Sequence, residues 1–175
     1  SKTFYFARIM PVVGAETGLY NAGEYDADEY SRKPKYADNL TGKITVIDYK
    51  DIKYFPDYIT PNFMLAVGVD LSTGEHQVSA YLGEVQTVYA SAENMYVALT
   101  SYRHEKISSL IYSKRLIAST SVYKFALNAG KIEYLAKGSV PGIILNQFSL
   151  DEYNGNLRIA TTEGDTWDSS SVNNI

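Results

Sequence analysis

The chain has 175 residues and a formal net charge of −4, and 45% of its residues are hydrophobic against 21% charged. This composition can bury a core and excludes an intrinsically disordered protein. The absence of cysteine excludes disulfides, thiolate metal sites and a cysteine nucleophile. Sixteen tyrosines, against six phenylalanines and one tryptophan, favour an all-β fold, because tyrosine suits strands and half-buried surfaces.

The charge pattern narrows the choice of partners. No basic stripe runs along the chain, and the small cluster Arg103–Lys106 contains its own acid. We therefore expect no nucleic-acid partner, since phosphate binding depends on clustered Lys and Arg. No apolar run approaches the roughly 18–20 residues of a membrane span. Residues 1–11 do not read as a signal peptide, so a secretion signal is expected outside this segment.

The N-terminal quarter predicts one strand followed by a long loop. Thr3–Ile9 is short and aromatic-rich, and Pro11 closes it. Residues 10–41 are polar and interrupted by glycine and proline, and a loop of this length is usually either functional or disordered. We favour disorder and keep four evenly spaced tyrosines as candidate ligand-binding residues: Tyr20, Tyr25, Tyr30 and Tyr36.

The middle of the chain predicts strands over Lys43–Tyr49 and Ile52–Phe55, and then a continuous apolar run over Phe63–Leu71. Such a run is typical of a strand buried on both faces. The turn residues Ser72-Thr73-Gly74 predict a hairpin to a strand over Gln77–Leu82.

Further strands are predicted over Thr87–Ala90, Met95–Ser101, Ser121–Leu127 and Lys131–Lys137, the last two joined by a turn at Asn128-Ala129-Gly130. Ser108–Ala118 is considered as a short helical turn, although its residues are also strand-like.

Two sequence patterns recur along the chain. Val69–Glu75 matches Phe125–Lys131 at an offset of 56 residues, and Asn94–Thr100 matches Asn156–Thr162 at an offset of 62. The later copy contains four extra residues, Glu152–Gly155, which we place in its turn. A repeated unit of four antiparallel strands, with one longer loop between the second and third, is typical of a β-propeller blade. The alternative is a β-sandwich with chance similarity among its strands.

Four stretches carry a family resemblance: VPGIILNQFSLDEYNGNLRIATTEG (140–164), DIKYFP (51–56), TVYASAENMYVALT (87–100) and TSVYKF (120–125). Over most of residues 43–175 the chain resembles a bacterial and archaeal family of secreted proteins with a β-propeller domain distantly related to WD repeats. The resemblance implies an all-β fold of antiparallel four-stranded blades and a secreted or cell-surface location. It implies no established catalytic residues.

We interpret residues 1–175 as a segment of one β-propeller domain, with about one full blade and parts of two others, because a closed ring needs at least four blades. Blade edges left open in such a segment are templates for pairing with another chain. The sequence therefore predicts a homodimer or strand exchange through these edges.

Acidic residues and histidines supply weak candidates for chemistry. Asp26, Asp28 and Glu29 offer the oxygen ligands that calcium prefers, but the run departs from the EF-hand pattern. We therefore favour a solvated acidic loop and predict no cofactor. The only histidines, His76 and His104, are expected at the surface, since the chain has no Gly-x-Ser-x-Gly nucleophile motif.

Two polar groups lie in the stretch 139–164. Asp151 and Glu152 with Arg158 could be read as a glycosidase-like acid pair, but adjacent residues on a turn point apart. We therefore predict a structural role for Asp151 and Arg158. Asn146 and Gln147 end an apolar run, so they are expected to be buried on an inner strand and to tie neighbouring blades together.

These observations predict a non-catalytic extracytoplasmic binding or scaffold module that engages a protein or a glycan. The alternative is a fragment of a propeller-type glycan-active hydrolase or lyase, which rests on fold analogy. Carboxylates converging in one pocket would favour the enzyme, and solvent-facing tyrosines in a shallow groove would favour binding.

Overall fold

The structure, a computed structural model, describes residues 3–11, 33–39, 41–55, 62–83, 85–106, 114–164 and 171–175. Strands make up most of this part of the chain, with two short 3-10 turns, so the predicted all-β class is confirmed. The chain divides into two compact units. The first unit is Ser1–Glu84 with Ala129–Lys131, and the second is Val85–Asn128 with Ile132–Ile175.

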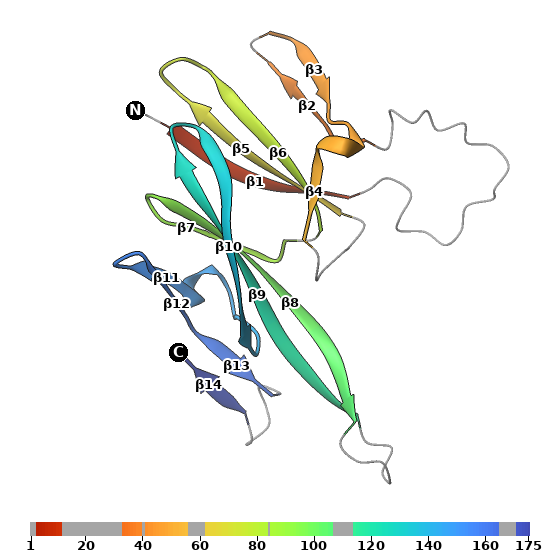
Figure 1. Ribbon diagram of the computed structural model, residues 1–175, viewed down its shortest axis with the longest axis vertical. Coiled ribbons are helices and arrows are strands. Elements are labelled where there is room, and N and C mark those ends of the chain that lie inside the picture. The colour runs from red at the N-terminus through yellow and green to blue at the C-terminus, as the bar shows by residue number, and fades with distance from the viewer. Residues whose placement is uncertain are drawn as a thin grey trace, which may run out of the picture. The chain divides into compact units, whose positions relative to one another are not determined.

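The first unit contains a four-stranded sheet in the order β1-β5-β6-β4 (Figure 1). Its strands are β1 (Thr3–Pro11), β5 (Asn62–Asp70), β6 (His76–Leu82) and β4 (Ile52–Tyr54). The central strand β5 is buried from residue 63 to residue 68, as its continuous apolar run predicts. The pairing of β4 with β6 is parallel, whereas β5 pairs antiparallel with both of its neighbours.

The predicted hairpin turn between β5 and β6 is confirmed. Gly74 adopts a φ of +75°, a left-handed conformation that glycine takes without steric cost. Asp70 Oδ1 accepts a hydrogen bond of 2.8 Å from the backbone N–H of Ser72, and this bond lowers the pKa of the Asp70 carboxyl. The turn is therefore held by its own polar side chains.

A second, smaller ladder in the first unit joins β2 (Lys35–Asp38) to β3 (Lys43–Val46). The prediction of an unbroken loop to residue 41 is therefore wrong at β2, because this short segment is recruited as a pairing partner for β3. The strand predicted over Lys43–Tyr49 ends early, where the 3-10 turn η1 (Tyr49–Asp51) turns the chain toward β4.

The second unit contains a sheet whose strands follow in chain order, β10-β9-β8-β7 (Figure 1). These are β7 (Thr87–Ala90), β8 (Asn94–Lys106), β9 (Lys114–Asn128) and β10 (Lys131–Pro141). This is the four-stranded unit that the repeat predicts. The longer loop predicted between its second and third strands is wrong over residues 102–106 and 114–120, which extend β8 and β9. The turn between β9 and β10 is confirmed at Ala129 and Gly130, with φ of 47° and 81°.

The suggestion of a helical turn over Ser108–Ala118 is wrong from residue 114 onward, because these residues belong to β9. The ladder between β8 and β9 runs from Asn94↔Ala126 to Lys106↔Lys114. The backbone of residues 114–118 pairs with residues 102–106 of β8, and residues 107–113 lie outside the described part.

Two short hairpins complete the second unit. One joins β11 (Leu150–Tyr153) to β12 (Asn156–Ile159), and the other joins β13 (Thr161–Glu163) to β14 (Val172–Asn174). Leu157 and Ile159 of β12, together with Ile144, pack on a core of Tyr96, Ala98 and Val122. The β11–β12 hairpin is therefore held on one face of the four-stranded sheet.

The prediction that the four extra residues of the later repeat copy lie in its turn is wrong. That turn has only two residues, Asn154 and Gly155, with the positive φ values of 49° and 75° that a tight hairpin requires. The excess lies further upstream. Ile143 bridges Thr162 and Leu150 pairs with Ile159, so the six residues 144–149 face only residues 160 and 161. The apolar run Ile143–Leu145 forms no strand and leads into a bulge that contains the 3-10 turn η2 (Gln147–Ser149).

Candidate functional site

The bulge around η2 and the neighbouring strand β7 form an open groove in the second unit. The groove has a volume of about 410 Å³. Its lining consists of Gln86, Thr87, Val88, Leu145, Asn146, Gln147 and Phe148. One wall of the groove therefore consists of residues 86–88, at and before the start of β7. The other wall consists of residues 145–148 of the bulge, which has no counterpart in the earlier copy of the repeat.

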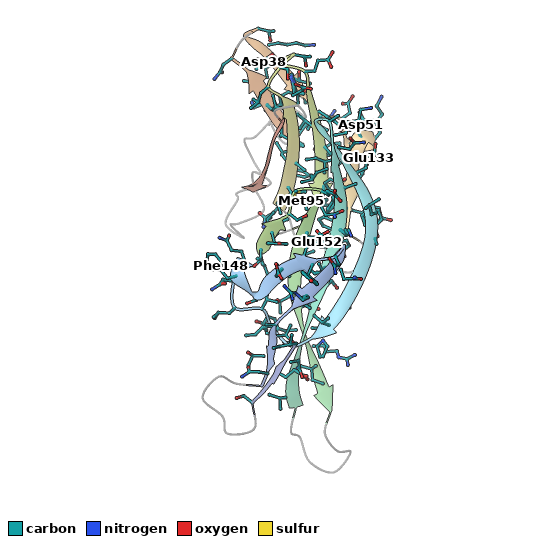
Figure 2. All side chains as sticks on the ribbon, turned by 90° about the vertical axis from the view of Figure 1, so that its left-hand side faces the viewer. Asp38, Asp51, Met95, Glu133, Phe148 and Glu152 are labelled. Carbon is teal, nitrogen blue, oxygen red and sulfur yellow. The ribbon has the colours of Figure 1, made fainter. Side chains whose placement is uncertain are left out.

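Two large apolar side chains of this groove are strongly exposed. Leu145 is 87% exposed and Phe148 is 86% exposed, and Figure 2 shows Phe148 at the outer margin of the chain. Scattered apolar residues are common on protein surfaces, but here two exposed apolar side chains and the half-buried Val88 line the same groove. Apolar residues gathered in one concave place commonly mark where a ligand is bound.

The β7 wall of the groove is rigidly attached to the sheet. Gln86 Oε1 accepts a hydrogen bond of 2.6 Å from the backbone N–H of Thr100, and Gln86 Nε2 donates one of 3.3 Å to the carbonyl of the same residue. The backbone N–H of Gln86 donates to the carbonyl of Ala98 at 3.4 Å. The side-chain amide thus takes the place of a strand residue and extends the β7–β8 ladder.

The opposite wall is held by Asn146. Its Oδ1 accepts a hydrogen bond of 2.9 Å from the backbone N–H of Phe148, and its carbonyl accepts one of 3.0 Å from the N–H of Ser149. Asparagine commonly caps a turn in this way. Asn146 and Gln147 are both exposed, so their expected burial on an inner strand is wrong. The bulge lifts them out of the ladder into solvent, and a role between blades stays a prediction.

A carboxylate attaches the β11–β12 hairpin to the turn between β7 and β8. Glu152 accepts hydrogen bonds from Ser91 Oγ at 2.7 Å, from Asn94 Nδ2 at 2.9 Å and from the Tyr96 hydroxyl at 3.0 Å. Its backbone N–H donates to the Tyr89 hydroxyl at 3.0 Å. This network of side chains from three strands and one turn positions β11 beside the sheet.

The network shifts the acidity of its members. The hydrogen bond from Ser91, followed by those from Tyr96 and Asn94, lowers the pKa of Glu152 against the opposing effect of burial. Burial raises the pKa of Tyr96 well above its ordinary value, and the hydrogen bond to Glu152 adds to this rise. Glu152 is therefore ionised and Tyr96 protonated near neutral pH, which suits an anchor.

Asp151 and Glu152 point in different directions, as expected for adjacent residues. Asp151 faces its cross-strand partner Arg158, with which it forms an exposed ion pair. The Arg158 guanidinium also lies 4.9 Å from the ring centroid of Tyr153. The two carboxylates are thus engaged on separate sides of β11 and do not converge in one pocket.

The tyrosine and calcium candidates fall mostly outside the described residues: Tyr20, Tyr25, Tyr30, Asp26, Asp28 and Glu29. Tyr36 lies on β2 in the first unit, where its ring packs edge-on against His76 at 5.9 Å between centroids. Within the ranges that the structure describes, no three His, Asp or Glu side chains come together as a metal site.

The sequence reasoning missed Glu152 as an anchor and Leu145 and Phe148 as an exposed pair. A signal for the anchor was present, because Ser91 and Asn94 stand at the turn of the earlier repeat copy, where short polar side chains often receive a carboxylate. For the apolar pair the sequence offered no signal, since a run such as Ile143–Leu145 equally predicts a buried strand.

Comparison with known proteins gives one family and one relative. A sequence model of the family described as "Beta propeller domain" matches residues 11–175. An uncharacterized protein of Archaeoglobus fulgidus is 34% identical over 118 residues, which cover 67% of this chain and 18% of that protein. The match thus spans under a fifth of the length of this relative. No solved structure matches the chain. None of the described residues forms a helix long and apolar enough to cross a membrane.

Proposed function

This chain belongs to the β-propeller domain family, and we propose that it is part of a non-catalytic extracytoplasmic binding module that holds its ligand in the groove between β7 and η2. The ligand is a protein or a glycan. The observation that carries this proposal is the exposure of Leu145 and Phe148, two large apolar side chains that line the same groove.

The lining residues suit binding by contact and hydrogen bonding. They offer apolar surface, amides and a hydroxyl, and none of the seven is an acid, a base or a histidine. Ligand sites are typically apolar concavities with a few polar groups that orient the ligand. Because Gln86 and Asn146 each hold one wall through hydrogen bonds, the groove exists before a ligand arrives.

The glycan-active hydrolase or lyase is less well supported. A glycosidase needs two carboxyl groups about 5–10 Å apart that face a sugar from both sides. Asp151 and Glu152 instead make an ion pair and an anchor, respectively. Asp151 is engaged by Arg158 within the hairpin and Glu152 by side chains of the β7–β8 hairpin, which supports a structural role for both.

The binding proposal is tested with the full-length protein, a glycan array and a displayed peptide library. Phe148→Ser and Leu145→Ser should each lower the affinity for a ligand of the groove by about tenfold or more, because serine removes apolar surface that the ligand would bury. Leu135→Ser is the matched control, because Leu135 on β10 is also exposed, at 53%, but does not line the groove. Ligands that bind equally well to all three variants would refute the site.

The proposed location has a separate test. An antibody against the second unit should detect protease-sensitive protein on intact cells of the source organism. Protection from protease until the cells are lysed would contradict an extracytoplasmic location.

A further inference from the structure

We infer that the ligand of the groove is an extended peptide segment that adds as a strand to the edge of β7 and places an apolar side chain between Val88 and Phe148. This inference rests on the proposed function and names the partner class for the same site. It is carried by the hydrogen-bond register of β7, the position of η2 and the size of the groove.

The strand β7 is the edge of its sheet, since among the described strands it pairs with β8 alone. The backbone N–H of Ser91 donates to the carbonyl of Asn94 at 2.8 Å. In an antiparallel ladder hydrogen-bonded pairs alternate with non-hydrogen-bonded pairs. With Tyr89↔Tyr96 as the next bonded pair, the backbone groups of Val88 and Ala90 point away from β8.

The bulge at η2 lies next to β7 but does not extend its ladder. Around η2, the backbone N–H of Ser149 donates to the carbonyl of Asn146, and the N–H of Ala160 donates to the carbonyl of Ser149. The N–H of Leu150 donates to the carbonyl of Gln147. Within the described ranges no backbone hydrogen bond joins this bulge to β7. The groove therefore combines the outward-facing backbone of Val88 on one wall with the exposed Leu145 and Phe148 on the other, and Ala90 continues the unpaired edge beyond the groove.

These two features together fit a strand-forming peptide. Main-chain hydrogen bonds supply affinity in strand addition, and pockets beside the edge select alternate side chains. Val88 contributes both kinds of contact, because its side chain lines the groove while its backbone faces outward. Leu145 and Phe148 then cover an apolar side chain of the peptide, and the exposed amide of Gln147 lies at the rim.

The size of the site favours a peptide over a second copy of this chain. A stable dimer usually buries about 800 Å² and some 20–30 residues on each partner. Here the edge strand has four residues and the groove is lined by seven. Such a site accommodates a short extended segment, so association with a second copy is an alternative that the test must detect.

The test begins with peptides selected from a displayed twelve-residue library on the full-length protein. The selected peptides are synthesised, and their Kd values are measured by fluorescence anisotropy. Each backbone amide is then N-methylated in turn, which removes one donor at a time. Strand addition predicts that alternate positions lose about tenfold in affinity, while the intervening positions change by less than about twofold.

Variants of β7 test the same hydrogen-bond register by changing the protein instead of the peptide. Ala90→Pro removes an outward-facing N–H and leaves the β7–β8 ladder intact, and edge strands tolerate proline at such positions. Ala90→Pro should raise the Kd of the peptide about tenfold. Ala90→Ser keeps the N–H, so this variant should bind the peptide with the Kd of the wild type. Thermal melting of both variants checks that the sheet is retained.

The outcomes separate this inference from the proposed function. Peptides that depend on Leu145 and Phe148 but show no alternation on N-methylation overturn strand addition and leave the groove as the binding site. A library that yields no peptide sensitive to Phe148→Ser overturns the peptide ligand. Sedimentation of the protein alone that shows a dimer dissociated by Phe148→Ser also overturns it, in favour of a second copy.

Discussion

The two hairpins related by the internal repeat, β7–β8 and β11–β12, close with different turns. In the first hairpin the longer turn Ser91–Glu93 connects the strands, and Ser91 and Asn94 bind the carboxylate of Glu152. In the second hairpin the tight pair Asn154-Gly155 does so, and the excess residues form the bulge that walls the groove. The two copies of the pattern thus share their strands but differ in their turns and in the bulge that only the second copy has.

The largest expected effect comes from matched positions of the two hairpins, because Tyr96 and Arg158 are related by the repeat offset. Tyr96 is 2% exposed, whereas Arg158 is exposed and pairs with Asp151. Tyr96→Ala should lower the free energy of unfolding by about 3–5 kcal/mol, as for other large aromatic deletions. Arg158→Ala should lower it by only about 0–1 kcal/mol. Urea denaturation measures the free energy of unfolding of both variants. An equal loss in Tyr96→Ala and Arg158→Ala would contradict the expectation that burial sets the size of the effect.

Glu152→Gln tests the anchor between the two hairpins. The amide keeps the shape of the side chain but replaces a carboxylate oxygen that accepts hydrogen bonds with a donor, so the contacts with Ser91, Asn94 and Tyr96 conflict. We expect a loss of about 1–2 kcal/mol, since hydrogen bonds to a charged group exceed neutral ones and partial exposure weakens them. Asp151→Asn is the neighbouring control and should change stability by about 0–1 kcal/mol.

The same anchor predicts a pH dependence. The folded-state pKa of Glu152 is lowered from 4.5, so the folded protein favours the ionised form. The ionised carboxylate therefore contributes fully to the free energy of unfolding above the pKa that Glu152 has in the unfolded chain. This contribution is lost as the pH falls through the pKa of Glu152 in the folded protein. The difference in melting temperature between the wild type and Glu152→Gln should therefore be constant from pH 7 to about 5 and shrink below about 4.5. A constant difference down to pH 3 would show that the carboxylate charge is not involved.

Gly155→Ala addresses the tight turn of the second hairpin. Space is available for a methyl group, but the φ of 75° is strained for alanine. The expected loss is roughly 1 kcal/mol. Ala92→Gly in the longer turn of the first hairpin should cost less than about 0.5 kcal/mol, because surface substitutions away from special geometry have small effects. Thermal unfolding of the two variants compares the turns directly.

The smallest expected effect belongs to the groove. Phe148→Ser and Leu145→Ser should change the free energy of unfolding by less than about 0.5 kcal/mol, since both side chains are mostly in solvent already. Calorimetry measures this, and a large destabilisation would show that these residues belong to the core. A neutral result would also mean that any loss of binding in the same variants reflects the site itself.

The sequence by itself determined the all-β class, the burial of β5 and the sequential four-stranded sheet from β7 to β10. These features follow from local causes: apolar runs, turn residues such as Ser72-Thr73-Gly74, and a repeated pattern that must bury the same faces in each copy. The runs and turns lie within a few residues along the chain, and the repeat is a comparison of the sequence with itself, so each can be read without knowledge of the contacts between distant residues.

Only the tertiary structure decided where the repeat breaks and what that break produces. The parallel pairing of β4, the recruitment of β2 and the anchor at Glu152 each depend on residues that are distant in sequence. The bulge at η2 arises because the tight turn at Asn154-Gly155 fixes the register of β11 with β12, so the four excess residues cannot be accommodated in the ladder. That register exposes Leu145 and Phe148, which a sequence pattern alone would bury.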